Sequence, residues 1–265
     1  MGLLVALVPP STQGGAWTEY ELYFFGLVSG EWPRAGVVSA GGSLFGTTSS
    51  AGDDNCDLDG CGAVYMLTPP ATHGGAWTET TIHTFTGLPG DGGCSFAPLT
   101  EGPGGVLYGT ASIGGSGSCT TGNSGLEGCG AVFQLTPPAA PGGAWTESVI
   151  YSFTGVNGDG AYPAASVVIG KNGALYGTTQ YGGTAAPACP DTFDVPGGCG
   201  TVFKLTPPSA PGGAWTETVL HDFTDANGDG ANPVAPLVRS STGVFYGTTS
   251  AGGTAGKGTI FAVAP

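Results

Sequence analysis

The sequence predicts an all-β protein built as a β-propeller, and three observations carry this prediction. First, a Gly-Gly-Ala-Trp-Thr-Glu segment recurs along the chain, and its tryptophans are Trp17, Trp77, Trp145 and Trp215. Second, they define periods of 60, 68 and 70 residues (77−17, 145−77 and 215−145), long enough for one sheet per repeat. Third, each period contains four short segments rich in β-branched and aromatic residues, and it shows no helical periodicity.

The four strands of one repeat are clearest toward the C-terminus. In the last copy we expect the first strand at residues 233–238, the second at 244–249 and the third at 258–263. The fourth strand is seen one repeat earlier, at residues 215–223, where alternate residues share one face. Each segment is bounded by Gly or Pro, which favours turns. A four-stranded meander repeated around an axis is a propeller blade, and closing the ring protects the sheet edges.

The two ends of the chain hold incomplete repeats. Residues 2–10, Gly-Leu-Leu-Val-Ala-Leu-Val-Pro-Pro, align with residues 62–70, so we interpret the apolar start as a third strand rather than an export signal. We therefore expect one domain, residues 1–265, with four blades of four antiparallel strands, closed by pairing of the N- and C-terminal strands. One third strand is in surplus, and it adds to an edge, frays or pairs with another molecule. A longer array that has been cut short is the alternative.

Composition narrows the function classes. Gly 52 and Pro 21 suit a chain with many turns, and only 9% of the residues are charged, with a net charge of −14 and a pI of about 4.1. Nucleic acid is excluded as a partner because its phosphates require Lys and Arg. Membrane insertion is not expected, because no run approaches about 20 apolar residues. The acidic balance fits a protein outside the cell or at its surface, or one that handles cations.

Six of the seven cysteines form three local pairs: Cys56 with Cys61, Cys119 with Cys129, and Cys189 with Cys199. All three pairs lie between the second and third strands of successive repeats. The fourth repeat has the shortest such loop, residues 250–258, and has lost both cysteines together, as a disulfide predicts. We therefore expect three disulfides and an oxidising compartment. A metal site is the weaker alternative because no histidine lies near. The seventh cysteine is Cys94.

Three motifs resemble a known bacterial tandem repeat. They are Leu-Tyr-Gly-Thr-Thr at residues 175–179, Gly-Thr-Val-Phe-Lys-Leu at 200–205 and Asn-Gly-Asp-Gly-Ala-Asn-Pro at 227–233. Together with the Trp-initiated strand, they make nearly the whole chain similar to the GloVer repeat and, more loosely, to kelch-type propeller blades. The resemblance implies a secreted or surface-anchored bacterial protein, and it brings no assigned activity.

The loops that join strands two to three and four to one emerge on the same end of a meander, and we expect this loop face to bind a ligand. The two-to-three loops vary in length on a constant scaffold, which is typical of recognition loops, although unconstrained drift gives the same pattern. The face is also acidic and should favour a cationic ligand over an anionic one. Its acids are Glu31, Asp53, Asp54, Asp57, Asp59, Asp91, Glu127, Asp159, Asp191, Asp194, Asp225 and Asp229.

One four-to-one loop resembles a calcium-binding loop. Asp225, Asn227 and Asp229 place oxygen donors at alternate positions, and a glycine follows the last of them. No bidentate Glu follows at the expected distance, and the sister loops around Asp91 and Asp159 keep fewer of the donors. Two hypotheses therefore stand: calcium at Asp225, Asn227 and Asp229, or a turn whose shared aspartate caps backbone N–H groups.

A second candidate site is a position that differs in every repeat. The residues just before the first strands are Trp32, Cys94, Tyr162 and Asn232. If the first strands line the axis, these side chains ring the mouth of a channel beside the shared aspartates Asp91, Asp159 and Asp229. Trp32 and Tyr162 would then stack on a sugar whose hydroxyl groups donate to those aspartates. The alternative is that the four side chains only fill a narrow axis.

Two other repeated positions are expected to be structural. The glutamates of the Trp-Thr-Glu segments are Glu19, Glu79, Glu147 and Glu217, and catalytic residues rarely occur in four copies. One position of the fourth strand holds Tyr23, His83, Tyr151 and His221. We interpret its two histidines as packing residues rather than as a metal pair.

Three functions are consistent with these observations, and the sequence does not decide whether the protein is an enzyme. The leading hypothesis is a secreted module that binds a ligand, carbohydrate above all, on the acidic loop face. The second is a glycosidase or lyase in which carboxylates such as Asp159 and Asp229 act as acid and base. The third is a structural module that self-assembles through its surplus strand.

Overall fold

The computed structural model is all-β, as predicted. It describes residues 2–26, 32–50, 60–72, 74–119, 128–140, 142–184, 189, 197–210 and 212–265. Within these residues the sheets are antiparallel, and the helical turns are two short 3-10 segments, η1 (Pro103–Gly105) and η3 (Lys171–Gly173). Neither turn has the length or the apolar character needed to cross a membrane, and no other helix occurs in the part of the chain that is described.

Three complete sheets repeat the expected four-stranded meander, and their strands are named in sheet order. Sheet I consists of β3 (Val38–Ala40), β4 (Ser43–Thr48), β5 (Ala63–Thr68) and β6 (Thr78–Thr84). Sheet II consists of β8 (Thr100–Glu101), β9 (Leu107–Ala111), β11 (Ala131–Thr136) and β12 (Thr146–Ser152). Sheet III consists of β14 (Val168–Ile169), β15 (Leu175–Thr179), β17 (Thr201–Thr206) and β18 (Thr216–Asp222).

The two ends of the chain form smaller sheets. The N-terminal hairpin pairs β1 (Gly2–Val8) with β2 (Thr18–Phe25), which are a third and a fourth strand by repeat position. The C-terminal sheet holds β20 (Val238–Arg239), β21 (Phe245–Thr248) and β23 (Ile260–Val263), which are a first, second and third strand. In sheets II and III and in the C-terminal sheet, a short ladder joins the loop before the first strand to the loop after the second strand. These ladders are β7 (Gly92–Gly93) with β10 (Ile113–Gly114), β13 (Gly160–Ala161) with β16 (Tyr181–Gly182), and β19 (Gly230–Ala231) with β22 (Ala251–Gly252).

The glycine of the Leu-Tyr-Gly-Thr-Thr motif is required by an aromatic ring. Gly109 pairs with Phe133 on the neighbouring third strand, and a Cβ atom at this glycine would overlap the Phe133 ring. Gly177 and Phe203 repeat this arrangement in sheet III. The missing side chain thus makes room for a large apolar residue that is fully buried.

The two threonines of the same motif make different hydrogen bonds. The first reaches the next sheet: Thr110 Oγ1 donates to the carbonyl oxygen of Ala165 at 3.1 Å. The second holds its own sheet, because the backbone N–H of Thr201 donates to Thr179 Oγ1 at 3.1 Å. One short motif therefore stabilises both the sheet and its junction, although sheet II has Ala111 in place of the second threonine and Thr178 Oγ1 in sheet III is buried without a hydrogen-bond partner.

Aromatic pairs hold neighbouring sheets together. The phenylalanine at the end of each fourth strand packs against the aromatic residue of the next third strand, with ring centroids 4.8 to 5.1 Å apart. The pairs are Phe25–Tyr65, Phe85–Phe133, Phe153–Phe203 and Phe223–Phe261. Such pairs contribute about 0.5–1.5 kcal/mol beyond the burial of their area. The core therefore runs from sheet to sheet through the repeated contact.

Two of the predicted disulfides are confirmed. Cys119 is bonded to Cys129, with Cα atoms 4.9 Å apart, and Cys189 to Cys199, with Cα atoms 5.3 Å apart. Cys61 is disulfide-bonded as well, and its predicted partner Cys56 lies outside the described residues. The two described bonds fit a protein of an oxidising, extracellular compartment.

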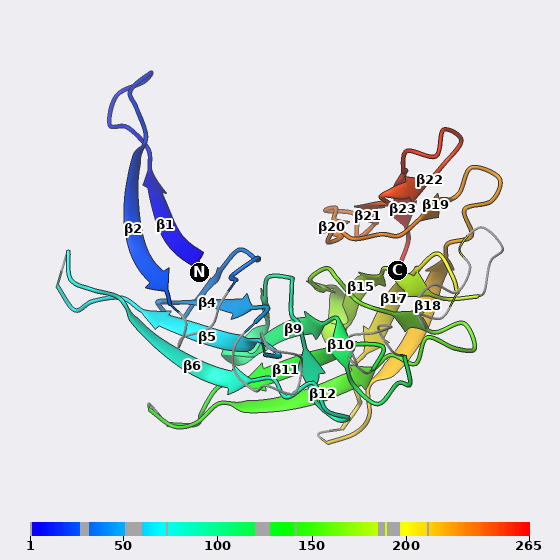
Figure 1. Ribbon diagram of the computed structural model, residues 1–265, viewed down its shortest axis with the longest axis horizontal. Helices are drawn as coiled ribbons and strands as arrows, with labels where there is room; N and C mark the ends of the chain where they lie inside the picture. The colour runs from blue at the N-terminus through cyan, green and yellow to red at the C-terminus, as the bar shows by residue number, and fades with distance from the viewer. Residues whose placement is uncertain are drawn as a thin grey trace.

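The sheets are arranged as an open arc (Figure 1), with the fourth strands on its convex side. The N-terminal hairpin and the C-terminal sheet are the two ends of the arc, and among the described residues no ladder joins them. The predicted pairing of N- and C-terminal strands is thus not formed in this structure. The reason is that β1 already hydrogen-bonds the edge of β2 along Gly2–Val8, so this edge has no free groups to offer β23.

Candidate functional site

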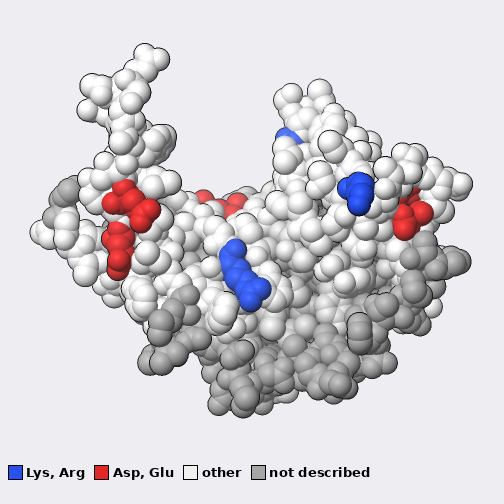
Figure 2. Space-filling model, turned by 45° about the horizontal axis from the view of Figure 1, so that its top comes forward, with Lys and Arg blue, Asp and Glu red and all other residues white. Residues whose placement is uncertain are grey.

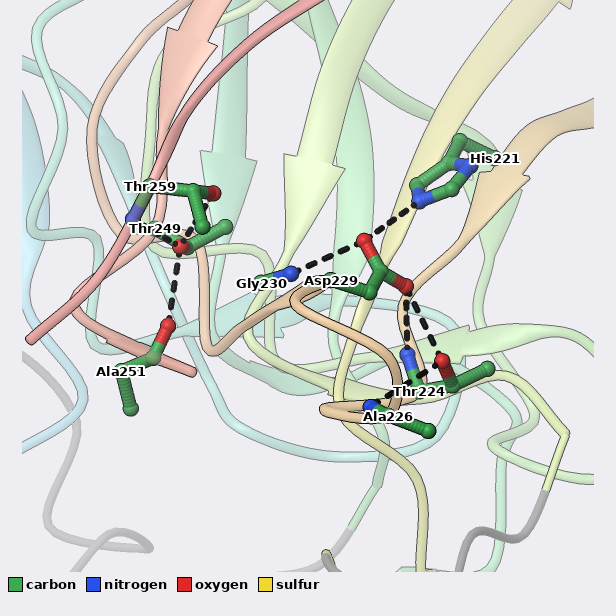
Figure 3. A network of polar contacts seen from close by, with 8 residues as sticks. All are labelled: His221, Thr224, Ala226, Asp229, Gly230, Thr249, Ala251 and Thr259. Carbon is green, nitrogen blue, oxygen red and sulfur yellow. Dashed lines mark hydrogen bonds and ion pairs between the residues drawn. The ribbon is translucent and has the colours of Figure 1, made fainter. Parts of the chain in front are cut away.

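Three junctions between sheets each contain the aspartate of a Gly-Asp-Gly turn, and both carboxylate oxygens of this aspartate accept hydrogen bonds (Figure 3). Asp229 Oδ2 accepts hydrogen bonds from the backbone N–H and the hydroxyl of Thr224, at 2.9 and 3.1 Å. Its Oδ1 accepts from the N–H of Gly230 at 2.8 Å and lies 3.2 Å from Nε2 of His221. Burial acts to raise the pKa of Asp229, but these hydrogen bonds outweigh it and the pKa is lowered.

Asp91 and Asp159 occupy the same kind of site. The backbone N–H and hydroxyl of Thr86 both donate to Asp91 Oδ2 at 2.8 Å, and those of Thr154 donate to Asp159 Oδ2 at 2.7 Å. The following glycine donates to the other carboxylate oxygen at 2.7 Å in both loops. These contacts are the ones that the turn-capping hypothesis predicts, and they place all three aspartates inside their loops.

The junction between sheets I and II brings a third residue to its aspartate. His83 on β6 has Nε2 3.2 Å from Asp91 Oδ1, and Glu147 on β12 comes from the next sheet. One ligand atom from each residue lies within 4.8 Å of the other two, and all three residues are partly buried. The Oε1 atom of Glu147 is buried without a hydrogen-bond partner. Burial raises the pKa of Glu147 to about 7; His83 opposes this shift and Asp91 adds to it.

The next two junctions are variants of this cluster. Between sheets II and III, Tyr151 takes the place of the histidine and hydrogen-bonds Asp159, and Glu217 is the glutamate. Burial, followed by the charge of Asp159, raises the pKa of Glu217 to about 7. Between sheet III and the C-terminal sheet, His221 and Asp229 are paired as in the first cluster. No fourth strand beside β23 is described, so this pair has no equivalent of Glu147 there.

The position that differs in every repeat has the same unusual backbone each time. Trp32, Cys94, Tyr162 and Asn232 all have positive φ angles, of 63°, 52°, 57° and 54°. Their backbone groups join sheets: the N–H of Tyr162 donates to the carbonyl oxygen of Cys129 at 2.8 Å, and that of Asn232 to Cys199 at 2.8 Å. A left-handed conformation is unfavourable for a bulky residue, so these hydrogen bonds must stabilise it.

Trp32 is the exposed member of this series. Its side chain is 48% exposed, and the guanidinium carbon of Arg34 lies 5.5 Å from the centre of its ring. The same guanidinium carbon lies 5.5 Å from the ring of Phe96, which is 39% exposed. We call Trp32, Arg34 and Phe96 the aromatic platform. Sequence reasoning placed Arg34 on the loop face only as a basic residue and assigned neither Arg34 nor Phe96 to the ligand site, although both follow the variable position by two residues.

The other predicted sugar-binding residues lie elsewhere. Tyr162 is buried, packs against Tyr181 with ring centroids 5.8 Å apart, and has a hydroxyl without a hydrogen-bond partner. Asn232 donates from Nδ2 to the carbonyl oxygen of Gln180 at 3.1 Å. The predicted pairing of Trp32 and Tyr162 as two stacking rings on one surface therefore stays a prediction, and the platform offers Phe96 as the second exposed ring.

The calcium hypothesis rests on a loop whose last donor is already used. Asp225 and Asn227 both have positive φ angles, of 53° and 54°, which such short polar residues tolerate. Both carboxylate oxygens of Asp229 accept hydrogen bonds from its own loop. Calcium at Asp225, Asn227 and Asp229 remains a prediction.

The acidic loop face is only partly described. Figure 2 shows, on the described part of one face, small separate groups of acidic and basic side chains on a largely uncharged surface. Most of the acids predicted to make this face acidic lie outside the described residues: Glu31, Asp53, Asp54, Asp57, Asp59, Glu127, Asp191 and Asp194. A strongly negative potential therefore stays a prediction.

A groove of about 750 Å³ lies where the Thr-Pro-Pro turn of sheet III meets the fourth strand of sheet II. Gln134, Ile150, Pro208 and Trp215 are among the residues that line it. Trp215 is partly buried and packs against Tyr108 with ring centroids 6.1 Å apart. This tryptophan therefore has a packing role, and it provides an internal control for the exposed Trp32.

Comparison with known proteins adds one finding. Residues 114–265, more than half of the chain, match the model of a family described as the Gloeobacter/Verrucomicrobia repeat. A search of the curated proteins finds no match to this chain.

Proposed function

Because this chain belongs to the Gloeobacter/Verrucomicrobia repeat family, which brings no activity of its own, we propose a function from the exposed chemistry: an extracellular module that binds carbohydrate. The observation that carries the proposal is the aromatic platform, in which two exposed rings flank one guanidinium group. The disulfides support the extracellular location.

The platform has the chemistry that a sugar needs. Aromatic ring faces bury the C–H groups of a pyranose, and a guanidinium presents five fixed N–H donors to ring and hydroxyl oxygens. Tryptophan and arginine are also enriched among the residues that dominate the binding energy of protein–protein interfaces.

Glycan-array binding followed by calorimetry tests the platform. We expect Trp32→Ala and Phe96→Ala each to weaken binding at least about tenfold, as loss of about 1.4 kcal/mol implies. Trp215→Ala, on the separate groove, is the control and should leave the affinity unchanged. Binding that persists in a Trp32→Ala/Phe96→Ala double variant would rule out the platform, and binding lost only in Trp215→Ala would move the site to the groove.

An enzymatic role for the loop carboxylates is the less supported alternative. Asp159 and Asp229 were the expected acid and base, and the oxygens of both accept hydrogen bonds from their own loops. Turnover of any polysaccharide in a panel, abolished by Asp159→Asn, would nevertheless replace binding with catalysis as the function.

We also propose that the arc closes into a four-bladed propeller when β23 replaces β1 on β2. Both are third strands, and β17 pairs with β18 in the register that β1 uses with β2, each with a bulge at the same point. Side chains at the two ends support this exchange. Ile260 of β23 is 83% exposed, whereas Val202 at the same repeat position is fully buried. Trp17 is 62% exposed, whereas Trp145 packs against Phe45 at 5.3 Å.

Closure is tested by the shape and mass of the 26.0 kDa chain in solution. We expect light scattering to give a monomer, and small-angle X-ray scattering to fit a ring rather than the arc of Figure 1. We also expect Ile260→Asp to destabilise the protein, because closure buries this side chain. An arc-shaped monomer with a silent Ile260→Asp would refute closure. A dimer would instead mean that the edges pair between copies, as in the self-assembly hypothesis.

A further inference from the structure

Three side chains with metal-binding atoms converge between sheets I and II. His83 Nε2 and Asp91 Oδ1 are 3.2 Å apart, and a carboxylate oxygen of Glu147 lies within 4.8 Å of both ligand atoms. His83 and Asp91 are largely shielded from solvent, with 19% and 16% of their side chains exposed. The Oε1 atom of Glu147 is buried with no hydrogen-bond partner, so a polar atom here lacks the compensation that burial normally requires.

The separation of the first two ligand atoms fits a small divalent cation. Zinc binds nitrogen and oxygen ligands at about 2.0–2.2 Å, so two ligands of a tetrahedral zinc ion lie about 3.3 Å apart. The 3.2 Å between His83 Nε2 and Asp91 Oδ1 already matches this separation. We propose that His83, Asp91 and Glu147 form a binding site for a divalent transition-metal ion of the zinc class, with a fourth position open to water or to a ligand.

The neighbours of the three side chains hold them in place. Asp91 Oδ2 accepts two hydrogen bonds from Thr86, and Oδ1 accepts one from the N–H of Gly92 at 2.7 Å. These bonds fix the carboxylate, and a further lone pair of Oδ1 is directed toward His83. The His83 ring packs edge-to-face on Phe85, with centroids 4.9 Å apart. Such outer contacts orient the ligands of metal sites and commonly change metal affinity by 10–100-fold. An imidazole nitrogen favours zinc-class ions over calcium, which takes oxygen ligands.

The chain contains its own comparison sites. The next junction has Tyr151, Asp159 and Glu217, so a phenol replaces the imidazole. The last junction has His221 and Asp229, 3.2 Å apart, and no equivalent of Glu147 is described beside them. The proposal therefore assigns strong binding to the first junction of the arc. If β23 replaces β1 on β2, Glu19 of β2 comes to the last junction as the counterpart of Glu147, and a second strong site is expected there. It does not depend on carbohydrate binding, and its test measures the metal directly.

Calorimetry with Zn²⁺ alone, on the full chain stripped with chelator, tests the site. We expect one strong equivalent of Zn²⁺ at His83, Asp91 and Glu147, and a second one at the last junction only if the ring closes. His83→Tyr, which copies the arrangement at Tyr151 and so preserves the fold, and Glu147→Gln should each weaken binding at the first junction more than about 100-fold, beyond the effect of outer contacts. His221→Tyr is the matched control and should keep the strong equivalent at the first junction. Tyr151→His should add a further one, and Co²⁺ bound in place of zinc should show the visible spectrum of tetrahedral coordination.

Each result decides the proposal. Absence of strong Zn²⁺ binding by the wild type, or an unchanged number of strong equivalents in both His83→Tyr and Glu147→Gln, would overturn it. Loss of all strong binding in His221→Tyr instead would place the metal at the last junction and also overturn it. Circular dichroism of every variant separates loss of the metal from loss of the fold.

Discussion

The third strands inside the arc and those at its ends have the same repeat positions and opposite surroundings. Leu135 on β11 is fully buried, whereas Leu7 at the same position of β1 is 59% exposed. Val202 on β17 is fully buried, whereas Ile260 on β23 is 83% exposed. The apolar pattern of the third strand therefore suits a strand that is covered by neighbouring sheets on both sides. At the ends of the arc the pattern remains and the neighbours are missing.

This difference shows which features one repeat specifies by itself and which features depend on its neighbours in the chain. Each repeat specifies its own meander and the aromatic contact to the next sheet, as stacked repeats generally do. It does not specify what covers the first and last sheets. Exposed apolar strands at sheet edges favour pairing with another strand, so the ends carry the driving force for closure or assembly.

The largest expected difference between the two regions is at the matched leucines. Leu135→Ala should lower the free energy of unfolding by about 2–5 kcal/mol, because it leaves a cavity in a packed interior. Leu7→Ala should change it by less than about 0.5 kcal/mol, as exposed sites do. Urea denaturation followed by tryptophan fluorescence measures both. Equal losses would mean that β1 is as well covered as β11 and would erase the distinction between interior and end.

The second largest expected difference concerns the disulfides of the interior sheets. Replacing Cys119 and Cys129 together by serine should cost about 3 kcal/mol or less, because the bond closes a short loop. The equivalent loop of the C-terminal sheet, residues 250–258, has no cysteine and should not respond to a reductant. Hydrogen exchange should thus show faster exchange near Cys129 and Cys199 after mild reduction, with the far-UV β signal retained. Global unfolding on mild reduction would contradict local loop closure.

The smallest expected effect concerns a half-buried carboxyl group of the interior. The pKa of Glu217 is raised from 4.5 to about 7 by burial and by Asp159. Its contribution to stability is therefore complete below pH 4.5 and is lost as the pH rises through 7. As the pH rises from about 5 to about 8, the free energy of unfolding of Glu217→Gln should increase by on the order of 1 kcal/mol relative to that of the wild type. This corresponds to a rise of about 2–4 °C in Tm relative to the wild type.

Glu101→Gln is the control for this pH dependence. Glu101 is exposed on β8, so its substitution should leave the pH dependence of Tm unchanged. Parallel pH profiles for Glu217→Gln and the wild type would show that Glu217 ionises normally in the folded protein.

Most of the local fold could be predicted from the sequence. The strands expected at residues 215–223, 244–249 and 258–263 correspond to β18, β21 and β23. The first strand was expected at residues 233–238, but β20 is Val238–Arg239. Pro233 has no N–H to give to a ladder, and the turn at Asn232 directs its backbone toward the previous sheet. Alternation and turn residues therefore located the second, third and fourth strands well and the first strands poorly.

The candidate sites were harder to predict because they depend on how neighbouring sheets are staggered. His83 and Glu147 are 64 residues apart (147−83) and occupy different repeat positions, so no spacing rule connects them. One signal was available: His83 precedes Asp91 by eight residues, and the same interval separates His221 from Asp229. Burial of Tyr162 against Tyr181 was likewise invisible, because the ring that covers it comes from a different strand.

The four residues with positive φ angles before the first strands, Trp32, Cys94, Tyr162 and Asn232, can differ in side chain without changing the fold. Their joining function belongs to the backbone: the N–H of Cys94 donates to Cys61 at 2.8 Å, and the carbonyl oxygen of Tyr162 accepts from Gln180 at 3.0 Å. The side chain takes no part in these bonds, so an indole, a thiol, a phenol and a carboxamide all occur here. Mutation can thus change what the protein presents at this position, and so what it recognises, without rebuilding the scaffold underneath.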